Sequence, residues 1–219
     1  MSVQTVNESK TILIAEMFET VQGEGKWVGT PAFFIRTGMC NLACSWCDTP
    51  YTWKEGETTY KKQTHEEVFQ RVEKSPIQHI VVTGGEPMLH QEFILALRKR
   101  NPHRFIEVET NGTIPSTLPP GTVNQFNISP KLSNSGNSWY KLNLRVNNSI
   151  FKFVVQSPDD IIEIENFIEQ NNIDRTKIFL MPEGTTRDIL LSRAKWLIPL
   201  CREKKIHYSP RLHIMKNIR

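Results

Sequence analysis

The sequence has no long apolar segment. None of its hydrophobic runs approaches the ~20 residues that cross a bilayer, and residues 1–10 are polar, without the apolar region of a secretory signal. No low-complexity tract, internal repeat or linker interrupts the 219 residues, of which 38% are hydrophobic. We therefore expect one folded domain over residues 1–219, located in the cytoplasm and without membrane attachment.

The charges show no strong excess of one sign. Lys and Arg total 27 and Asp and Glu total 23, for a net charge of +4, and the basic residues are scattered along the chain. Surfaces that bind nucleic acid carry clustered basic side chains. The composition therefore argues against direct binding of nucleic acid.

Short segments rich in Val, Ile and Phe alternate with amphipathic helical patterns from residue 32 onward. The expected strands are residues 32–36, 79–83, 105–109, 125–128, 150–155 and 177–181. Helices are expected after Thr64, over residues 91–99, after Pro158 and from about Thr185, the last with a kink at Pro199. This alternation predicts an α/β fold with parallel strands, whose functional groups gather beyond the carboxyl ends of the strands. About six strands are too few for a closed eight-stranded barrel, so we expect a partial, open one.

The sequence has only four cysteines, and three of them, Cys40, Cys44 and Cys47, crowd into one segment. A zinc site usually needs four Cys or His ligands with paired Cys-x2-Cys spacing, and no second pair exists in the sequence. Three thiolates on one loop hold three irons of a [4Fe–4S] cluster and leave the fourth open. The spacing therefore predicts such a cluster, shielded by Trp46, with a zinc site or three buried cysteines as the alternative. Cys201 lies on the apolar face of the last helix and is expected in the core.

A second segment, Thr83-Gly84-Gly85-Glu86-Pro87, follows an expected strand. Two glycines allow a close approach of the backbone to a ligand, and free N–H groups bind anionic or carbonyl groups. Alone, the segment is a common strand-to-helix turn.

Together, these cysteines and this segment resemble the radical S-adenosylmethionine superfamily. The resemblance implies that the methionine part of S-adenosylmethionine binds the open iron, and that one electron from the cluster cleaves the cofactor to a 5′-deoxyadenosyl radical. It also implies that Gly84, Gly85 and Glu86 bind the cofactor, with Glu86 accepting a hydrogen bond from its amino group. One departure is Met39, where the superfamily usually has glycine, which predicts a differently shaped loop before Cys40.

Further segments resemble the 7-carboxy-7-deazaguanine synthase family over nearly the whole length. They are Gln22-Gly23-Glu24-Gly25, Arg36, Asp48-Thr49, Glu109-Thr110-Asn111-Gly112, Ser129-Pro130-Lys131 and His213-x3-Asn217-Ile218-Arg219. The resemblance implies a lyase that contracts 6-carboxy-5,6,7,8-tetrahydropterin to 7-carboxy-7-deazaguanine with loss of ammonia, in the biosynthesis of queuosine-type deazapurines. It further implies catalytic use of S-adenosylmethionine, dependence on Mg²⁺, a reducing flavodoxin-type electron donor and a homodimer.

The same resemblance assigns roles to individual residues. The implied substrate-binding residues are Val21, Gln22, Gly23, Glu24, Arg36, Thr83, Glu109, His213 and Arg219, with residues 207–219 closing the site. The implied cofactor-binding residues are Gly84, Gly85, Glu86, Ser129, Pro130, Lys131, Leu180, Met181, Pro182 and Glu183. Carboxylate and amide groups suit the flat donor and acceptor edge of a pterin, and Arg36 supplies a fork for the substrate carboxylate, with His213 as a second donor. Thr49 offers a hard oxygen to Mg²⁺.

Structural roles compete with several of these assignments. Arg36 could pair with a surface carboxylate, Thr49 could cap the following helix, and His213 could be a satisfied histidine without a catalytic role. One of Glu107 and Glu109 could make only a structural salt bridge. For the whole protein, the alternatives are an activase of a glycyl-radical enzyme and an iron–sulfur or zinc module without enzymatic activity.

Overall fold

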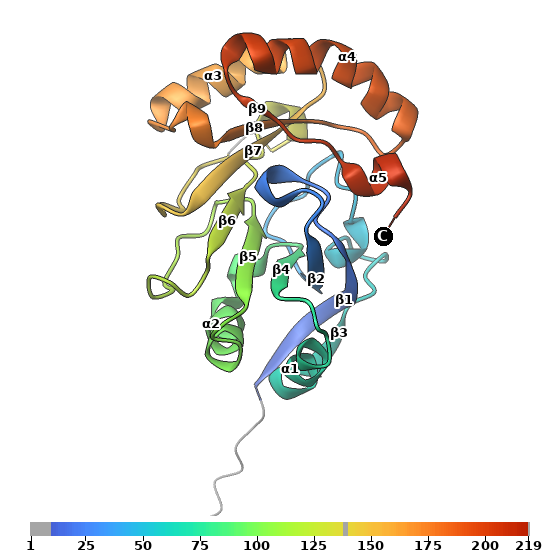
Figure 1. Ribbon diagram of the computed structural model, residues 1–219, viewed down its shortest axis with the longest axis vertical. Coiled ribbons are helices and arrows are strands. Elements are labelled where there is room, and N and C mark those ends of the chain that lie inside the picture. The colour runs from blue at the N-terminus through green and yellow to red at the C-terminus, as the bar shows by residue number, and fades with distance from the viewer. Residues whose placement is uncertain (1–9, 138–139, 219) are drawn as a thin grey trace, which may run out of the picture.

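The computed structural model describes residues 10–137 and 140–218, and within them one sheet of nine strands forms the centre of the molecule (Figure 1). Its spatial order is β3-β1-β2-β4-β5-β6-β7-β8-β9. The strands are β1 (Thr11–Val21), β2 (Pro31–Thr37), β3 (Lys61–Thr64), β4 (His79–Gly84), β5 (Phe105–Thr110), β6 (Gln125–Ile128), β7 (Ser149–Val155), β8 (Ile178–Pro182) and β9 (His207–Tyr208). The six expected strands are β2 and β4 to β8, and they run parallel as predicted. The sheet is not closed, so the partial, open barrel is confirmed.

The main helices pack at opposite ends of the sheet. They are α1 (His65–Glu73), α2 (Gln91–Arg100), α3 (Asp160–Gln170), α4 (Arg187–Lys204) and α5 (Leu212–Lys216). Figure 1 shows α3 and α4 beside β7 to β9, and α1 and α2 at the far end. The capping box is confirmed, because Thr64 Oγ1 accepts from the Glu67 amide while the Glu67 carboxylate accepts from the Thr64 amide. Within the described ranges, no helix is long and apolar enough to cross a membrane.

Three strands were not expected from the sequence. Strand β1 pairs antiparallel with β2, and its register shifts between Ile14 and Glu16. Such a bulge interrupts the alternation of buried and exposed side chains by which a strand is recognised in a sequence. Strands β3 and β9 are short and lie at the two edges of the sheet, where few contacts constrain their composition.

The two faces of the sheet differ in chemistry, because successive side chains of a strand point to opposite faces. On one face, residues such as Ile35, Val82 and Val108 join the main apolar core beneath the helices. On the other face, several strands place a polar residue near their carboxyl ends. Examples are Arg36 opposite Thr83 and Glu109 opposite Asn127, which are register partners in neighbouring strands. This alternation builds a polar inner surface.

Candidate active site

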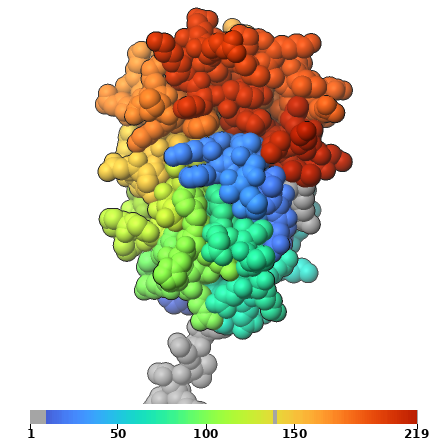
Figure 2. All heavy atoms as spheres, viewed as in Figure 1, coloured from blue at the N-terminus to red at the C-terminus, as the bar shows by residue number. Residues whose placement is uncertain are grey.

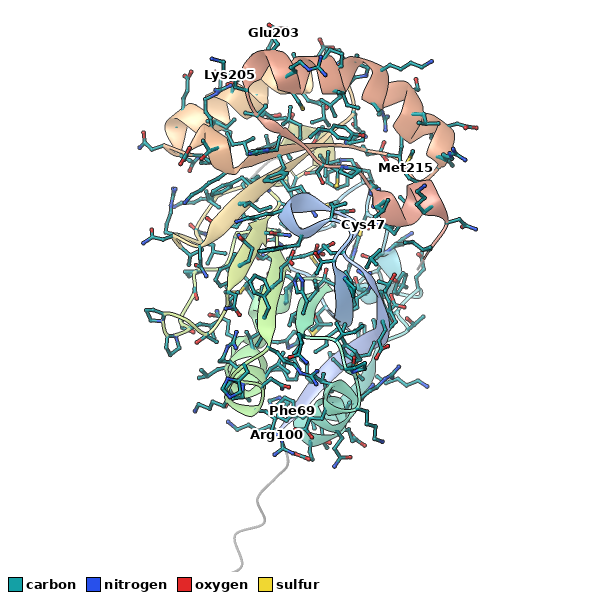
Figure 3. The ribbon with its side chains drawn as sticks, in the orientation of Figure 1. Cys47, Phe69, Arg100, Glu203, Lys205 and Met215 are labelled. Carbon is teal, nitrogen blue, oxygen red and sulfur yellow. The ribbon has the colours of Figure 1, made fainter. Side chains whose placement is uncertain are left out.

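One pocket opens on this inner surface, at the carboxyl ends of the parallel strands. The expected residues that line it are Val21, Gln22, Gly23, Glu24, Arg36, Cys40, Cys44, Cys47, Thr49, Thr83, Gly84, Gly85, Glu109, Ser129, Lys131, Met181, Glu183 and His213. Figure 2 shows the blue N-terminal segment against the red C-terminal one, and Figure 3 shows Cys47 on the side of the sheet where α5 carries Met215. Residues far apart in the sequence thus meet around one space.

All three clustered cysteines are free thiols that face this pocket, and each sulfur receives an N–H group. The Leu42 amide lies 3.5 Å from Cys40 Sγ, Asn137 Nδ2 lies 3.2 Å from Cys44 Sγ, and Trp53 Nε1 lies 3.3 Å from Cys47 Sγ. Donors aimed at sulfur suit thiolates that carry negative charge and tune the potential of a cluster. Neither Asn137 nor Trp53 was anticipated from the sequence.

The thiols fit an iron–sulfur cluster better than a single ion. Burial raises the pKa of Cys40 to about 11 and also raises the pKa of Cys44, so both are protonated near neutrality unless a bound metal displaces the proton. Among the described residues, no three His, Cys, Asp or Glu side chains converge closely enough to hold one metal ion. A zinc ion needs such convergence, whereas a four-iron cluster is larger and separates its ligands.

The part of the pocket lined by the three cysteines is called the cysteine side, and Trp46 and Lys131 form one wall of it. Trp46 is half-buried, and its indole N–H donates a 2.7 Å hydrogen bond to the Asn134 carbonyl. The Lys131 ammonium lies 5.2 Å from the centre of the Trp46 ring and donates to Ser129 Oγ at 2.7 Å. The loop that contains Asn134 therefore holds the shielding side chain in place.

The glycine-rich segment plays a different part from the expected one. The amides of Gly85 and Glu86 are not free for a ligand, because they donate to the carbonyls of Thr37 and Met39. A Cβ on Gly85 would lie 1.9 Å from the Met39 carbonyl oxygen. The two glycines are thus required where the end of β4 touches the backbone of the cluster loop, although both still line the pocket.

The Glu86 side chain is occupied by donors from the protein itself. Its carboxylate is fully buried and accepts from the Met88 amide at 2.9 Å, from Thr110 Oγ1 at 2.6 Å and from the Asn111 amide at 2.7 Å. It is not among the residues that line the pocket. In the structure, Glu86 therefore joins the end of β4 to the end of β5, and its expected hydrogen bond to the amino group of the cofactor stays a prediction.

Met39 keeps the backbone shape that glycine usually provides. Its φ angle is 69°, in the left-handed region that side chains rarely adopt. Its amide donates to the Thr52 carbonyl at 2.7 Å, and its carbonyl accepts from Glu86, so contacts on both sides hold this conformation. The loop before Cys40 therefore keeps a glycine-like shape despite the substitution.

In the two segments expected to bind the cofactor, residues 129–131 and 180–183, alternate side chains line the pocket. Ser129 and Lys131 line the pocket and Pro130 between them does not. Met181 and Glu183 line it, whereas Leu180 is fully buried in the core on the opposite face of β8, and Pro182 shares that parity. The side chains of Pro130, Leu180 and Pro182 therefore do not line the pocket, and their expected contact with the cofactor stays a prediction.

The loop after β1 carries polar side chains that line the pocket, among them Gln22 and Glu24. The Gln22 amide group donates to Glu107 at 2.9 Å and to Glu109 at 3.2 Å. Glu24 accepts from Lys152 and, at 3.2 Å, from Arg211. Burial alone would raise the pKa of Glu24, but these two cations hold it well below its ordinary value.

His213 comes close to this loop. Its Nε2 atom lies 4.0 Å from Glu24, and burial lowers its pKa. It faces the pocket and so is not a histidine satisfied elsewhere in the described structure.

Of the two glutamates on β5, Glu107 is the structural one. It is fully buried, accepts from His79 Nε2 at 2.6 Å and also accepts from Gln22 and Asn127. Glu109 lies two residues further along the strand, on the same face, and lines the pocket. Asn127 lines it too, and its buried Oδ1 has no partner among the described residues, which is a place for a donor from a ligand.

Arg36 pairs with a carboxylate and also faces the pocket. Its Nε donates to Glu16 at 2.8 Å, and the Tyr51 hydroxyl donates to the same oxygen at 2.8 Å. The carboxylate orients the guanidinium rather than removing it from the site, since Arg36 remains among the lining residues.

Thr49 does not cap the short helix that follows it through its side chain. Its hydroxyl lies 3.8 Å from Cys47 Sγ and beside the pocket. A hydroxyl at this position is available to a hard cation, and the neighbouring carboxylate of Asp48 accepts from Arg211.

Two further cations of the site were not anticipated, namely Lys152 on β7 and Arg211 before α5. Arg211 joins Glu24, Asp48 and the Gly184 carbonyl. A lysine in the middle of an otherwise apolar strand is a signal that could have identified Lys152. The remaining expected residue, Arg219, lies outside the described residues.

Comparisons with known proteins agree with this geometry. The family model of the radical SAM superfamily matches residues 34–190. A 7-carboxy-7-deazaguanine synthase of Rhodopirellula baltica is 33% identical over 226 aligned positions, covering 93% of this chain and 86% of that protein. The synthase of Pyrobaculum aerophilum is 34% identical and covers 93% of this chain and 94% of that protein. The crystal structure of QueE from Escherichia coli has a TM-score of 0.74 at 25% identity, over 93% of this chain and 95% of that one.

Proposed function

Because the chain belongs to the radical SAM superfamily and, within it, to the family of 7-carboxy-7-deazaguanine synthases, we propose that it catalyses the synthase reaction. In this reaction, 6-carboxy-5,6,7,8-tetrahydropterin loses ammonia and its ring contracts to 7-carboxy-7-deazaguanine. The observation that carries the proposal is a single pocket, with three cysteine thiols at one side and carboxylates, Arg36 and His213 at another.

The cysteine side fits the cofactors of the superfamily. Cys40, Cys44 and Cys47 would hold three irons of a [4Fe–4S] cluster, whose open iron binds S-adenosylmethionine. When bound, this pair supplies a 5′-deoxyadenosyl radical for hydrogen abstraction. Ser129, Lys131, Met181 and Glu183 line the same pocket, which supports assigning their side chains to the cofactor, with Gly84 and Gly85 beside it.

The other side fits a planar heterocycle with a carboxylate. Glu24 and Glu109 accept hydrogen bonds from the amino and ring N–H groups of the pterin, and Gln22 fixes Glu109 from behind. Arg36, oriented by Glu16, has further guanidinium N–H groups for the substrate carboxylate, with His213 as a second donor. We propose that Thr49 gives one oxygen to Mg²⁺ and that water and substrate oxygens complete its coordination.

Four further expectations, two from the composition of the sequence and two from the family resemblance, stay proposals. They are one domain over residues 1–219, a homodimer, a flavodoxin-type electron donor and a place in the cytoplasm. An activase of a glycyl-radical enzyme is not favoured, because a protein backbone as substrate gives no reason for the buried carboxylates and cations of this pocket.

The decisive experiment uses the full chain, reconstituted anaerobically with iron and sulfide. With a chemical reductant, S-adenosylmethionine, Mg²⁺ and the carboxytetrahydropterin, the absorbance of 7-carboxy-7-deazaguanine should appear. Deoxyadenosine without any deazapurine would support another radical SAM activity. Absence of both, in protein that contains iron, would contradict an enzymatic role.

A further inference from the structure

Lys152 is a charged residue at the centre of a strand whose seven residues, Ser149–Val155, are all buried. Its side chain is 5% exposed. It shares the inner face with Val154, which also lines the pocket, whereas Phe151, Phe153 and Val155 belong to the core on the other face. A buried ammonium is costly unless carboxylates compensate it, so its presence here requires an explanation.

Two carboxylates from different elements meet this ammonium. Lys152 Nζ donates to Glu24, which follows β1, and lies 3.9 Å from Oε1 of Glu109 on β5. Burial alone would lower the pKa of Lys152, but Glu24 and Glu109 outweigh it and raise the pKa, so the ammonium stays charged. All three side chains line the pocket.

Other charges reach the same two carboxylates. Arg211 donates to Glu24, and His213 lies 4.0 Å from it. The buried carboxyl group of Glu107 lies on the same strand as Glu109. The Gln22 amide group donates to Glu107 and to Glu109. Glu24 therefore keeps a second cation when Lys152 is removed, whereas Glu109 loses the cation that faces it in the described structure.

Ionised carboxylates are strong acceptors for the donor edge of a pterin, yet carboxylates gathered in one pocket repel each other. We propose that Lys152 is a substrate-positioning residue: its ammonium offsets the charges of Glu24 and Glu109 and holds both carboxylates aimed into the pocket, where they accept hydrogen bonds from the amino and ring N–H groups of the pterin. This inference rests on the proposed function and adds a residue to its binding site.

The test replaces Lys152 with methionine, which retains the length of the side chain without its charge. In Lys152→Met, the KM for the carboxytetrahydropterin should rise about thirty-fold, as expected when one partner of a buried charge pair is removed. Iron content and the affinity for S-adenosylmethionine should match the wild type. Lys62→Met, at an exposed lysine of β3, is the matched control and should leave KM unchanged.

Two further variants keep the proposal testable if Lys152→Met folds poorly. Lys152→Arg keeps the charge and should recover part of the affinity. Adding Lys152→Met to Glu109→Gln should raise KM less than the product of the single effects, because a neutral Glu109 position no longer needs the ammonium.

A wild-type KM in Lys152→Met would overturn the role, and so would a loss of iron in step with the loss of affinity. Both outcomes presuppose that the wild-type protein forms deazaguanine. Failure of the wild type to do so would instead contradict the proposed function.

Discussion

Gly23 packs directly against His213, since a Cβ built on Gly23 would lie 2.3 Å from Nδ1 of the histidine ring. The Gly23 carbonyl also accepts a 2.9 Å hydrogen bond from the Leu212 amide, at the start of α5. The loop after β1 and the helix that carries His213 are therefore joined at this point. Any side chain at position 23 has to displace His213 from the pocket.

Gly23→Ala should accordingly impair substrate use while leaving the cluster intact. A displacement of about 1 Å at a site residue costs roughly a hundredfold in kcat/KM. Steady-state kinetics with varied pterin should show this loss, with iron content unchanged. In the double variant Gly23→Ala/His213→Ala, the collision is absent, so the two losses should not multiply. Full multiplication would mean that Gly23 acts independently of His213.

The cluster assignment leads to the second prediction. Replacing Cys40, Cys44 or Cys47 with Ala should abolish reductive cleavage of S-adenosylmethionine, because each removes one of three ligands. Reconstituted wild-type protein should contain about four irons. Cys201→Ser is the control, since Cys201 is buried in α4 and lies outside the pocket lining. Full cleavage activity in any triad variant would rule out the cluster ligands proposed here.

Local patterns were sufficient for much of the fold and for the cysteine side of the site. Each of the six expected strands is short and rich in Val, Ile or Phe, and the capping box at Thr64 and Glu67 is a local device. The cysteines lie on one loop, so their spacing alone places them together. The bulge in β1 concealed that strand, because it interrupts the period on which strand prediction depends.

Long-range partners could not be predicted in this way. The ion pair of Lys152 with Glu24 joins residues 128 positions apart, and Arg211 reaches Glu24 over 187 positions. No local pattern records such a pair. The motif around Glu86 identified the segment but not the direction of the side chain, which depends on donors from Thr110, at the end of β5, and from Asn111 directly after it. At Leu180, the family resemblance gave a stretch of residues, whereas alternation along β8 decides which of them face the pocket.

Recognition of the substrate carboxylate gives the third prediction. Arg36→Ala should leave that carboxylate unpaired and raise KM by a factor equivalent to about 2–5 kcal/mol. Arg36→Lys should also be impaired, because lysine cannot pair with Glu16 and present a planar fork at once. Arg100→Ala removes an exposed arginine paired with Glu73 at the far end of the molecule (Figure 3) and should leave KM unchanged. Near-native KM values for both Arg36 variants would mean that Arg36 only forms a structural ion pair with Glu16.

The fourth prediction concerns the metal ion. Thr49→Ala should raise the Mg²⁺ concentration needed for half-maximal turnover, because it removes the one hydroxyl that we propose as a protein ligand. Thr49→Ser keeps the oxygen and should titrate like the wild type. Iron content should be the same in all three proteins, since the Thr49 hydroxyl lies beside the Cys47 sulfur without being one of the cluster ligands.

Thermal unfolding separates this metal-binding role from the helix-capping alternative. The Thr49 side chain makes no capping hydrogen bond to the short helix over Pro50–Thr52. Loss of a true cap costs about 1 kcal/mol of stability, whereas loss of this hydroxyl should leave the melting temperature of the Mg²⁺-free protein nearly unchanged. A lowered melting temperature together with an unaltered Mg²⁺ titration would assign Thr49 to the loop structure instead. An unchanged melting temperature together with a shifted Mg²⁺ titration would support the metal-binding role. Only a residue that binds the ion changes the Mg²⁺ concentration that the protein needs.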